Sequence, residues 1–143
     1  MSLIKSTLVP MLAATAALFA STLAQAADNA MAQKFAADRL AFFGKGDAAA
    51  ILKQYAEDAT VITPNGVLHG RAQIKGMVDG IIAEFAQPGV KFDLKSQAAE
   101  GPIVTFMWAA ETGKNVYDLG AETYVLKDGL AEYQTFAAKV TPR

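Results

Sequence analysis

The sequence contains no cysteine, carries almost no net charge and has few residues of the types that bind metals or act as nucleophiles. Without cysteine no disulfide can form, so packing has to stabilise the fold. The 13 Lys and Arg residues balance 14 Asp and Glu residues, and the basic residues are scattered without interleaved aromatic residues. This distribution lacks the electrostatic footprint of a nucleic-acid-binding protein, and we exclude nucleic acid as a main partner.

The candidates for metal binding and nucleophilic catalysis are correspondingly few. His69 is the single histidine, and no cysteine or carboxylate stands near it at the spacing of a metal site. Ser96 is the only serine after residue 26, and it lies between Lys95 and Gln97 in a segment that we expect to be a solvent-exposed strand. The sequence therefore predicts no metal, no cofactor and no serine or cysteine nucleophile.

Residues 1–26 predict a cleavable secretory signal peptide. Lys5 supplies a positive start, an apolar run covers residues 8–20, and Ala24-Gln25-Ala26 provides the small residues of a cleavage site. The apolar run is shorter than the roughly 20 residues that a membrane-spanning helix needs, so a retained anchor is the less favoured alternative. We expect the domain at residues 27–143 to be periplasmic or secreted and free of the membrane. Loss of Lys5 changes the net charge from −1 to −2.

Apolar spacing predicts three helices in this domain. Residues 71–86 repeat apolar side chains at intervals of three and four, residues 29–43 carry them near helical spacing, and residues 48–56 form a shorter helical pattern. Asp47 precedes the shorter pattern and is placed to accept hydrogen bonds from its first free N–H groups. We therefore expect two adjacent helices, separated by a break at Gly44-Lys45-Gly46.

The remaining segments predict strands. The β-rich residues 60–63 meet the turn Pro64-Asn65-Gly66 and continue into residues 67–70, which indicates a short hairpin. The chain from residue 90 to 140 has no helical pattern and is interrupted by turn residues, which predicts a meander of four strands. This order of elements favours an α+β domain in which a curved antiparallel sheet wraps around three helices.

Four short stretches share their residue types with one superfamily. They are Gly46-Asp47 together with residues 55–61, His69-Gly70-Arg71, residues 120–129, and Gln134-Thr135-Phe136. In these stretches the chain resembles the nuclear transport factor 2-like superfamily, most closely its SnoaL-like branch, which also contains polyketide cyclases and steroid Δ-isomerases. The resemblance implies a cone-shaped, cystatin-like roll with an open interior over residues 27–143. It implies no single activity, because this fold hosts isomerases, dehydratases, epoxide hydrolases and non-enzymes.

The resemblance also permits a test for steroid isomerisation, which uses three functional groups. The general base of those isomerases, an Asp before a Pro at the end of the first strand, corresponds to Thr63, which cannot act as that base. The oxyanion-hole Tyr on their first helix corresponds to Arg39, and their protonated Asp on the fifth strand corresponds to Glu122. Because one carboxyl remains of the three groups, we do not expect steroid isomerisation by the usual mechanism.

Strand pairing predicts which polar side chains share the interior face. A two-residue turn at Gly113-Lys114 places Thr105 opposite Glu122. A three-residue loop at 127–129 places Gln134 opposite Glu122 as well, so that all three side chains lie on one face. A two-residue turn at Asp128-Gly129 is the alternative, and it would turn Gln134 to the other face.

Glu122 is the candidate for acid/base chemistry, because a carboxyl that faces an enclosed apolar space favours its neutral form and can donate a hydrogen bond or transfer a proton. Asp118 is a second candidate, nearer the rim. The candidate ligand-binding residues are polar or aromatic side chains expected on the pocket wall: Gln134, Thr105, Tyr124, Tyr55, Thr63 and Arg39. The alternatives are a satisfied polar cluster without chemistry around Glu122 and a purely structural role for the two tyrosines.

Three functions stay open at this point. The first is an exported domain that encloses a small, largely apolar molecule, and the second is a lyase, isomerase or hydrolase that uses Glu122 as acid or base. The third is a non-catalytic interaction module whose cone is filled by its own side chains. A cavity of at least roughly 300 Å³ would separate the third function from the other two.

The sequence also predicts a homodimer. Phe106, Trp108 and Ala110 alternate with Met107 and Ala109, so the two sets lie on opposite faces of one strand. We expect Phe106 and Trp108 on the outer face of the sheet, where an apolar surface is typical of a dimer interface.

Overall fold

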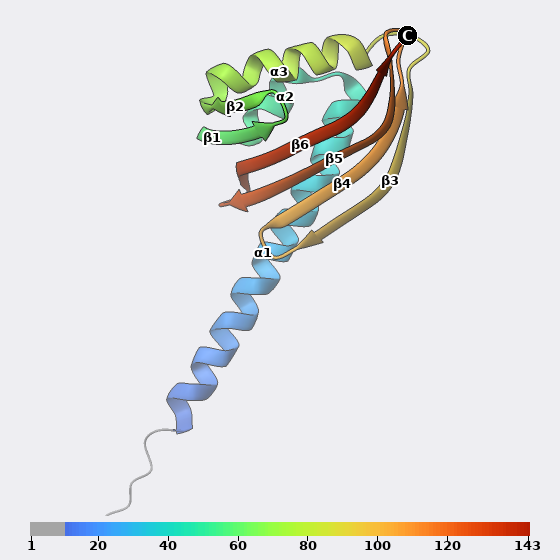
Figure 1. Ribbon diagram of the computed structural model, residues 1–143. Helices are drawn as coiled ribbons and strands as arrows, with labels where there is room; N and C mark the ends of the chain where they lie inside the picture. Colours follow the sequence, from blue (N-terminus) through green and yellow to red (C-terminus); the bar gives the residue numbers. More distant parts are fainter. Residues whose placement is uncertain (1–10) are drawn as a thin grey trace, which may run out of the picture.

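The computed structural model describes residues 11–143, with side chains described from residue 20 onward. Helix α1 (Met11–Lys45) contains the expected helix at residues 29–43 and extends from it toward the N-terminus, away from the sheet (Figure 1). Helix α3 (Gly70–Phe85) covers the expected segment within one residue at each end. Its buried side chains, Ile74, Val78 and Ile82, keep the predicted spacing of four residues.

Helix α2 (Ala48–Lys53) is shorter than expected and follows α1 directly. Asp47 caps it as predicted, because its side chain accepts a hydrogen bond from the backbone N–H of Ala50 at 2.9 Å. The helix ends before residue 56 because the first strand already begins at Tyr55, whose side chain is almost completely buried. The burial of that ring in the core outweighs the weak helical preference of the segment.

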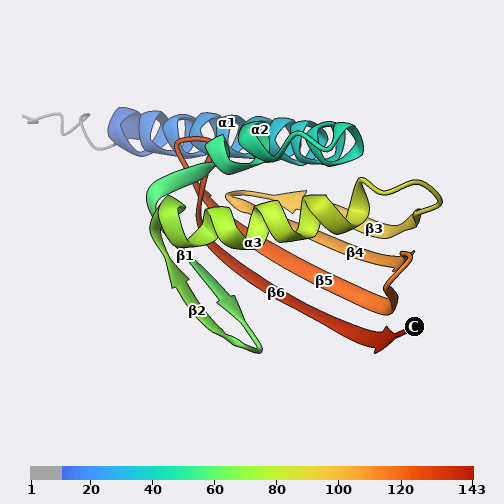
Figure 2. The ribbon, with the colours of Figure 1, turned by 90° about the horizontal axis from the view of Figure 1, so that it is seen from above.

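Six strands form one curved sheet beside the helices (Figure 2). They are β1 (Tyr55–Thr63), β2 (Gly66–His69), β3 (Lys91–Glu100), β4 (Ile103–Glu111), β5 (Asn115–Lys127) and β6 (Leu130–Pro142). Their order in the sheet is β2-β1-β6-β5-β4-β3. All neighbouring pairs are antiparallel except β1 and β6, which run parallel. The α+β class and the curved sheet around three helices are therefore confirmed, with one parallel pair that the sequence did not reveal.

A β-bulge in β5 corrects the predicted pairing with β4. Near the turn the pairing is as expected, with Ala110 opposite Tyr117. Farther from the turn it shifts by one residue, because Asp118 and Leu119 both lie where β4 supplies one residue. Glu122 therefore lies opposite Phe106 and not opposite Thr105. Thr105 lies opposite Thr123 instead, on the outer face of the sheet.

The turn between β5 and β6 is also different from the expected one. It is a two-residue turn at Asp128-Gly129, where both residues have positive φ, 51° and 78°, as in the type I′ turn of a hairpin. By itself this turn would direct Gln134 to the outer face. A second irregularity, at Glu132, adds one residue to β6 and places Gln134 opposite Tyr124. Gln134 and Glu122 thus share the inner face as predicted, although they are not opposite each other.

The outer face of the sheet is not the one predicted for the dimer. Phe106 and Trp108 are 3% and 5% exposed and face the concave interior. Phe106 lies opposite Glu122, and directly opposite residues of neighbouring strands share one face of a sheet. Phe106 and Trp108 are therefore on the same face as Glu122, which is the inner one. Met107, which is 43% exposed, lies on the outer face instead. The expectation that Phe106 and Trp108 form an outer interface is therefore wrong.

The predicted signal peptide falls partly outside the described residues, because residues 1–10 are not described. Within the described part, residues 20–27 are exposed along α1. The first side chain of α1 with a described contact to the sheet region is Asn29, whose Oδ1 accepts a hydrogen bond from the backbone N–H of Gly101. None of the helices described in residues 11–143 is long and apolar enough to cross a membrane.

Candidate functional site

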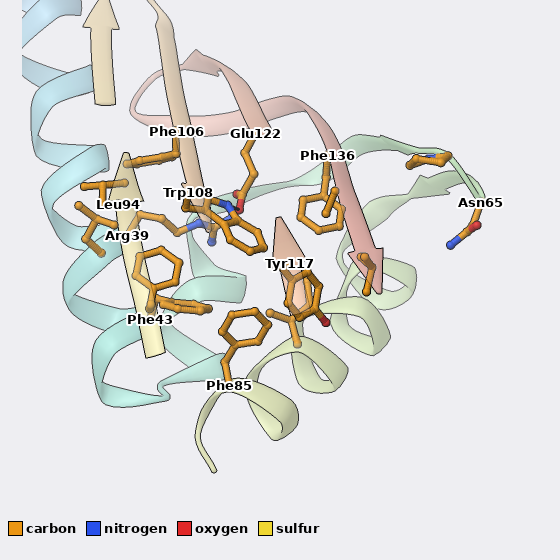
Figure 3. A pocket seen from close by; sticks show the side chains of 16 residues that line it. Arg39, Phe43, Asn65, Phe85, Leu94, Phe106, Trp108, Tyr117, Glu122 and Phe136 are labelled. Atoms are coloured by element: carbon orange, nitrogen blue, oxygen red, sulfur yellow. Dashed lines mark hydrogen bonds between the residues drawn. The ribbon is translucent and has the colours of Figure 1, made fainter. Parts of the chain in front are cut away.

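A cavity of about 350 Å³ lies between α1, α3 and the inner face of the sheet. Most of its wall is apolar, and aromatic rings dominate it: Phe43, Phe85, Phe92, Phe106, Trp108 and Phe136. Figure 3 shows several of these rings around the space into which Glu122 projects from β5. The volume exceeds the roughly 300 Å³ that a small-molecule site needs, so the cone is not filled by its own side chains.

Glu122 is held at this cavity by three hydrogen-bond donors. The indole Nε1 of Trp108 donates to Oε1 at 2.9 Å. The Tyr124 hydroxyl donates to Oε2, and Nε2 of Gln134 donates to the same oxygen at 3.3 Å. All three contacts place Glu122 as the acceptor. The hydrogen bond that the carboxyl was expected to donate is not among them.

Arg39 is the buried cation of the site, with 7% of its surface exposed. Its Nη2 donates to the hydroxyls of Tyr55 at 2.5 Å and Tyr124 at 2.8 Å. Its Nε donates to the Tyr124 hydroxyl at 3.2 Å. Its Nη1 donates to the carbonyl of Ile51 at 3.3 Å and to Oε1 of Gln54 at 3.4 Å. The guanidinium also lies 4.9 Å and 4.8 Å from the ring centres of Tyr55 and Tyr124, which adds a cation–π contribution.

Gln134 closes the network between the two tyrosines. Its Oε1 accepts a hydrogen bond of 2.6 Å from the Tyr55 hydroxyl, and its Nε2 donates to the Tyr124 hydroxyl at 2.9 Å. No buried side-chain nitrogen or oxygen among the described residues lacks a hydrogen-bond partner. A satisfied buried network of this kind fixes one arrangement of its members.

The charges of the network act on the two buried phenols. Burial raises the pKa of Tyr55 and raises that of Tyr124 well above 10.0, while the Arg39 guanidinium opposes both shifts. For Arg39 itself, burial acts to lower the pKa, but Tyr124, Tyr55 and Glu122 together raise it above its ordinary value. Arg39 is therefore charged and both phenols are neutral at any physiological pH.

Gly120 sets the position of Trp108. It lies opposite Trp108 in the β4–β5 pairing, and a Cβ at this position would lie 2.3 Å from Cε2 of the indole. No real Cβ tolerates that distance, so the indole can lie this close to β5 only because residue 120 has no side chain. In this position the indole Nε1 donates to Glu122.

Five of the eight residues predicted for the site come together in the structure. Glu122 lies on the cavity wall, and Arg39, Tyr55, Tyr124 and Gln134 form the network behind it. The relation of Glu122 to a cation was missed, because Arg39 was assigned only by resemblance and no partner was predicted for it.

The other three predicted residues lie elsewhere. Thr105 is on the outer face, opposite Thr123. Asp118 is exposed at the bulge and forms an ion pair of 3.0 Å with Lys139, so it does not face the cavity. Thr63 belongs to the β1–β2 turn, where its hydroxyl donates to the carbonyl of Gly66 at 3.0 Å. None of the three is among the residues that line the cavity.

Trp108 is the functional residue that sequence reasoning missed. It was assigned to the outer surface, whereas it lines the cavity and donates to Glu122. The available signal was Gly120, two residues before Glu122, because a glycine within a strand often marks the close approach of another group.

A second polar cluster lies at the other end of the sheet. Oε1 of Glu84 accepts hydrogen bonds from the Thr112 hydroxyl at 2.6 Å and from Nδ2 of Asn115 at 2.8 Å. Although burial alone would raise the pKa of Glu84, these hydrogen bonds hold it below its ordinary value. The cluster attaches the β4–β5 turn to the C-terminal part of α3. It contains no histidine or second carboxylate, and in residues 11–143 no set of three or more His, Cys, Asp or Glu side chains is placed to hold a metal ion.

Most residues of this site fall within the match to a known protein family. The family model described as a SnoaL-like domain matches residues 35–133, which include every member of the network around Glu122 except Gln134. The chain belongs to the SnoaL-like domain family. Among curated proteins none matches the chain.

Solved structures similar to this SnoaL-like protein share its fold. A putative ketosteroid isomerase from Kribbella flavida is 17% identical, with a TM-score of 0.63 over 78% of this chain and 80% of that one. A nuclear transport factor 2-like protein of unknown function from Mesorhizobium loti is 19% identical, with a TM-score of 0.64 over 78% and 93%. The epoxide hydrolase/cyclase-like enzyme SalBIII, described in pyran ring formation in the polyether salinomycin, is 17% identical, with a TM-score of 0.67 over 81% and 98%. At such identities the likeness concerns the fold, and the superfamily resemblance seen in the sequence is confirmed.

Proposed function

We propose that this protein is an exported binding protein that encloses a small, largely apolar molecule in the cavity beside Glu122. The observation that carries the proposal is the cavity of about 350 Å³, whose wall is mainly aromatic and aliphatic and whose inner end holds one carboxylate. Ligand pockets commonly combine an apolar lining with a small number of placed polar groups. The SnoaL-like family and its fold support a domain of this kind.

The proposal is tested by blocking the cavity. Ala138 lines it, whereas its neighbour Ala137 lies on the outer face of the same strand. Menthol serves as the probe, because it is a compact alicyclic alcohol that does not absorb where tryptophan does. Isothermal titration calorimetry should detect menthol binding to the unaltered protein and to the Ala137→Phe variant, and a loss of binding in Ala138→Phe. Equal binding by both variants would place the menthol outside the cavity and contradict the proposal.

A second candidate function is acid/base catalysis, and the position of Glu122 favours it. A carboxylate that contacts an enclosed cavity is placed to accept a proton from a bound molecule. The test reaction is the epimerisation of menthone to isomenthone, in which Glu122 would remove the proton next to the carbonyl and the same carbon would then be reprotonated. Menthone that binds less tightly than menthol still reports this reaction. Catalysis would appear as epimerisation that falls by roughly 10² to 10⁴ in Glu122→Gln. Binding without epimerisation in either protein leaves the first function alone.

Export is part of the proposal and is supported by the N-terminal part of α1. Residues 20–27 are exposed along α1, and the side chain of Asn29, beyond the expected cleavage point, accepts a hydrogen bond from the backbone of Gly101. Cleavage after Ala26 would leave this contact with the domain in place. Expression of the full chain in a bacterium with a periplasm, followed by N-terminal sequencing, should give a periplasmic product that begins at Ala27. A product that retains Lys5 would contradict cleavage at this site.

We also propose a homodimer, now through the true outer face of β4, β5 and β6. This face presents uncharged side chains in paired rows: Thr105, Thr123 and Thr135, and beside them Met107, Ala121 and Ala137. Exposed Ile103 and Tyr133 continue it. Because the patch contains no charged residue in these rows, two copies can face each other without repulsion between like charges.

A further inference from the structure

The chemistry that the cavity can offer a ligand follows from the hydrogen-bond donors that are already used. Arg39 has five N–H groups, and the structure gives it five hydrogen bonds, to the hydroxyls of Tyr55 and Tyr124, the carbonyl of Ile51 and the side chain of Gln54. Although Arg39 lines the cavity, it has no N–H group left for a ligand.

The other donors of the network are also occupied. The Tyr55 hydroxyl donates to Gln134, and the Tyr124 hydroxyl donates to Glu122. The amide of Gln134 donates to Tyr124 and to Glu122, and the indole N–H of Trp108 donates to Glu122. The inner end of the cavity therefore presents no free donor.

One acceptor position remains, and it belongs to Glu122. An ionised carboxylate offers about four lone-pair positions on its two oxygens, of which three are used here. Oε2 accepts two of the bonds, from Tyr124 and Gln134, and neither of these residues lines the cavity of about 350 Å³; both line a smaller one of about 50 Å³. Oε1 accepts one bond, from Trp108, which does line it. Oε1 is thus the oxygen on the cavity side, and it has an unused position.

The remaining polar residues of the wall lie away from this oxygen. Asn65 is exposed on the β1–β2 turn, at the edge of the lining residues (Figure 3). The Tyr117 hydroxyl hydrogen-bonds Glu84 and accepts a bond of 3.4 Å from Asn115. Neither side chain competes for the open position on Glu122.

We infer that the cavity selects apolar molecules that carry a hydroxyl or N–H group and direct it to Oε1 of Glu122, and that it disfavours molecules whose polar end is a carbonyl or an anion. The inference rests on the proposed function and specifies its ligand class. A carbonyl oxygen or an anion would meet an ionised carboxylate without any free donor beside it, which leaves both acceptors desolvated and unpaired.

This selectivity is the reverse of what the steroid isomerase resemblance implies. In those enzymes the two corresponding positions donate hydrogen bonds to an oxygen of the bound molecule. In this chain the first position holds Arg39, whose N–H groups are all used, and the second holds Glu122, which accepts three bonds. The preference for a donor therefore comes from residues of this chain that depart from the family pattern.

Menthol and menthone test the inference, because they share one carbon skeleton and differ in a hydroxyl against a carbonyl. Calorimetric titration of the unaltered protein should give a dissociation constant for menthol roughly tenfold or more below that for menthone, since a hydrogen bond to a charged group exceeds a neutral one in strength. In Glu122→Gln the amide offers a donor, and the ratio should fall to about one or invert. Asp118→Asn is the matched control, because this carboxyl lies on the same strand but pairs with Lys139 at the surface. It should keep the ratio of the unaltered protein.

Each other outcome identifies which idea has failed. If the unaltered protein binds menthone as tightly as menthol or more tightly, and the Ala138→Phe variant loses this binding, the donor preference is overturned and the binding function stays intact. Absence of binding by both probes overturns the binding function and the inference with it. A menthol preference that persists in a folded Glu122→Gln variant shows that another residue provides the acceptor, which also overturns the inference. The comparison in the unaltered protein does not depend on the folding of any variant.

Discussion

The indole ring of Trp108 lies directly over Gly120, so close that a methyl group at residue 120 would come within 2.3 Å of the ring. The two residues are opposite each other on β4 and β5. Because Trp108 also donates to Glu122, the missing side chain at residue 120 decides how the carboxylate of the site is held.

We predict that Gly120→Ala displaces the indole and destabilises the protein. Overpacking of this kind costs about 1 to 3 kcal/mol of the free energy of unfolding. Chemical denaturation measures this loss, and the fluorescence of Trp108, the single tryptophan, should show a changed environment. Gly76→Ala is the control, because a Cβ at this helical position meets no atom within 4 Å. It should be neutral or stabilising, and an equal loss in both variants would contradict the contact described here.

Arg39 supplies the second prediction. Arg39→Met keeps an unbranched apolar stem but removes the buried guanidinium, so the hydroxyls of Tyr55 and Tyr124 and the oxygens of Ile51 and Gln54 lose their donor, and Glu122 loses a nearby positive charge. Breaking a buried charged network in this way costs about 3 to 5 kcal/mol. Lys34→Met on the same helix is the control, because the Lys34 side chain is 75% exposed and its surface ion pair contributes about 1 kcal/mol or less. A loss in Arg39→Met no larger than in this control would show that the cation does not hold the site together.

The buried phenols predict a loss of stability at alkaline pH. Burial raises the pKa of Tyr55 and of Tyr124 above the ordinary value of 10.0. The folded protein therefore holds these protons more tightly than the unfolded chain, so the contribution to stability is complete below about pH 10 and declines as the pH rises toward the folded values. Denaturation curves between about pH 8 and pH 11 should show the free energy of unfolding falling over this interval.

A tyrosine variant isolates this effect from other alkaline titrations. Tyr55→Phe removes one of the two phenols, so the decline with pH should be shallower than in the unaltered protein, whatever its stability at neutral pH. Stability that is constant or rises between about pH 8 and pH 11 would contradict the burial of the two phenols.

The corrected outer face predicts the effect of one charge on assembly. Met107→Glu places a carboxylate in the uncharged patch of each protomer, and the two carboxylates of a symmetric dimer would repel each other and lose hydration. Light scattering should show a dimer for the unaltered protein and a monomer for this variant. Ala49→Glu is the control, because Ala49 is exposed on α2 and away from the sheet. A monomeric unaltered protein would contradict the proposed dimer.

The parts of the fold that depend on local signals were predictable from the sequence. The Asp47 cap, the apolar spacing of α3 and the turn at Gly113-Lys114 all act within a few residues, and all were confirmed. The pairing of Glu122 was not predictable, because no turn residue or spacing pattern in the sequence marks the bulge at Asp118. A one-residue shift exchanges the two faces of a strand, which explains why Thr105 was assigned inward and Trp108 outward.

In the candidate site, too, local signals in the sequence did not reveal the long-range contacts. Glu122 and Gln134 were assigned to one face, but this result came from a three-residue loop that does not exist, and the irregularity at Glu132 restores the face by another route. Arg39 was marked only as a departure from the isomerase pattern. Its five hydrogen bonds join residues that are as far apart in the sequence as Ile51 and Tyr124, and such long-range contacts leave no local signal.

A crystal structure of the protein with menthol would locate both the bound molecule and its polar end. We expect menthol inside the cavity among Phe106, Trp108 and Phe136, with its hydroxyl oxygen about 2.5 to 3.0 Å from Oε1 of Glu122. Menthol bound only outside the cavity, or bound inside with its hydroxyl directed away from Glu122, would show that Glu122 is not the acceptor of a ligand in this cavity.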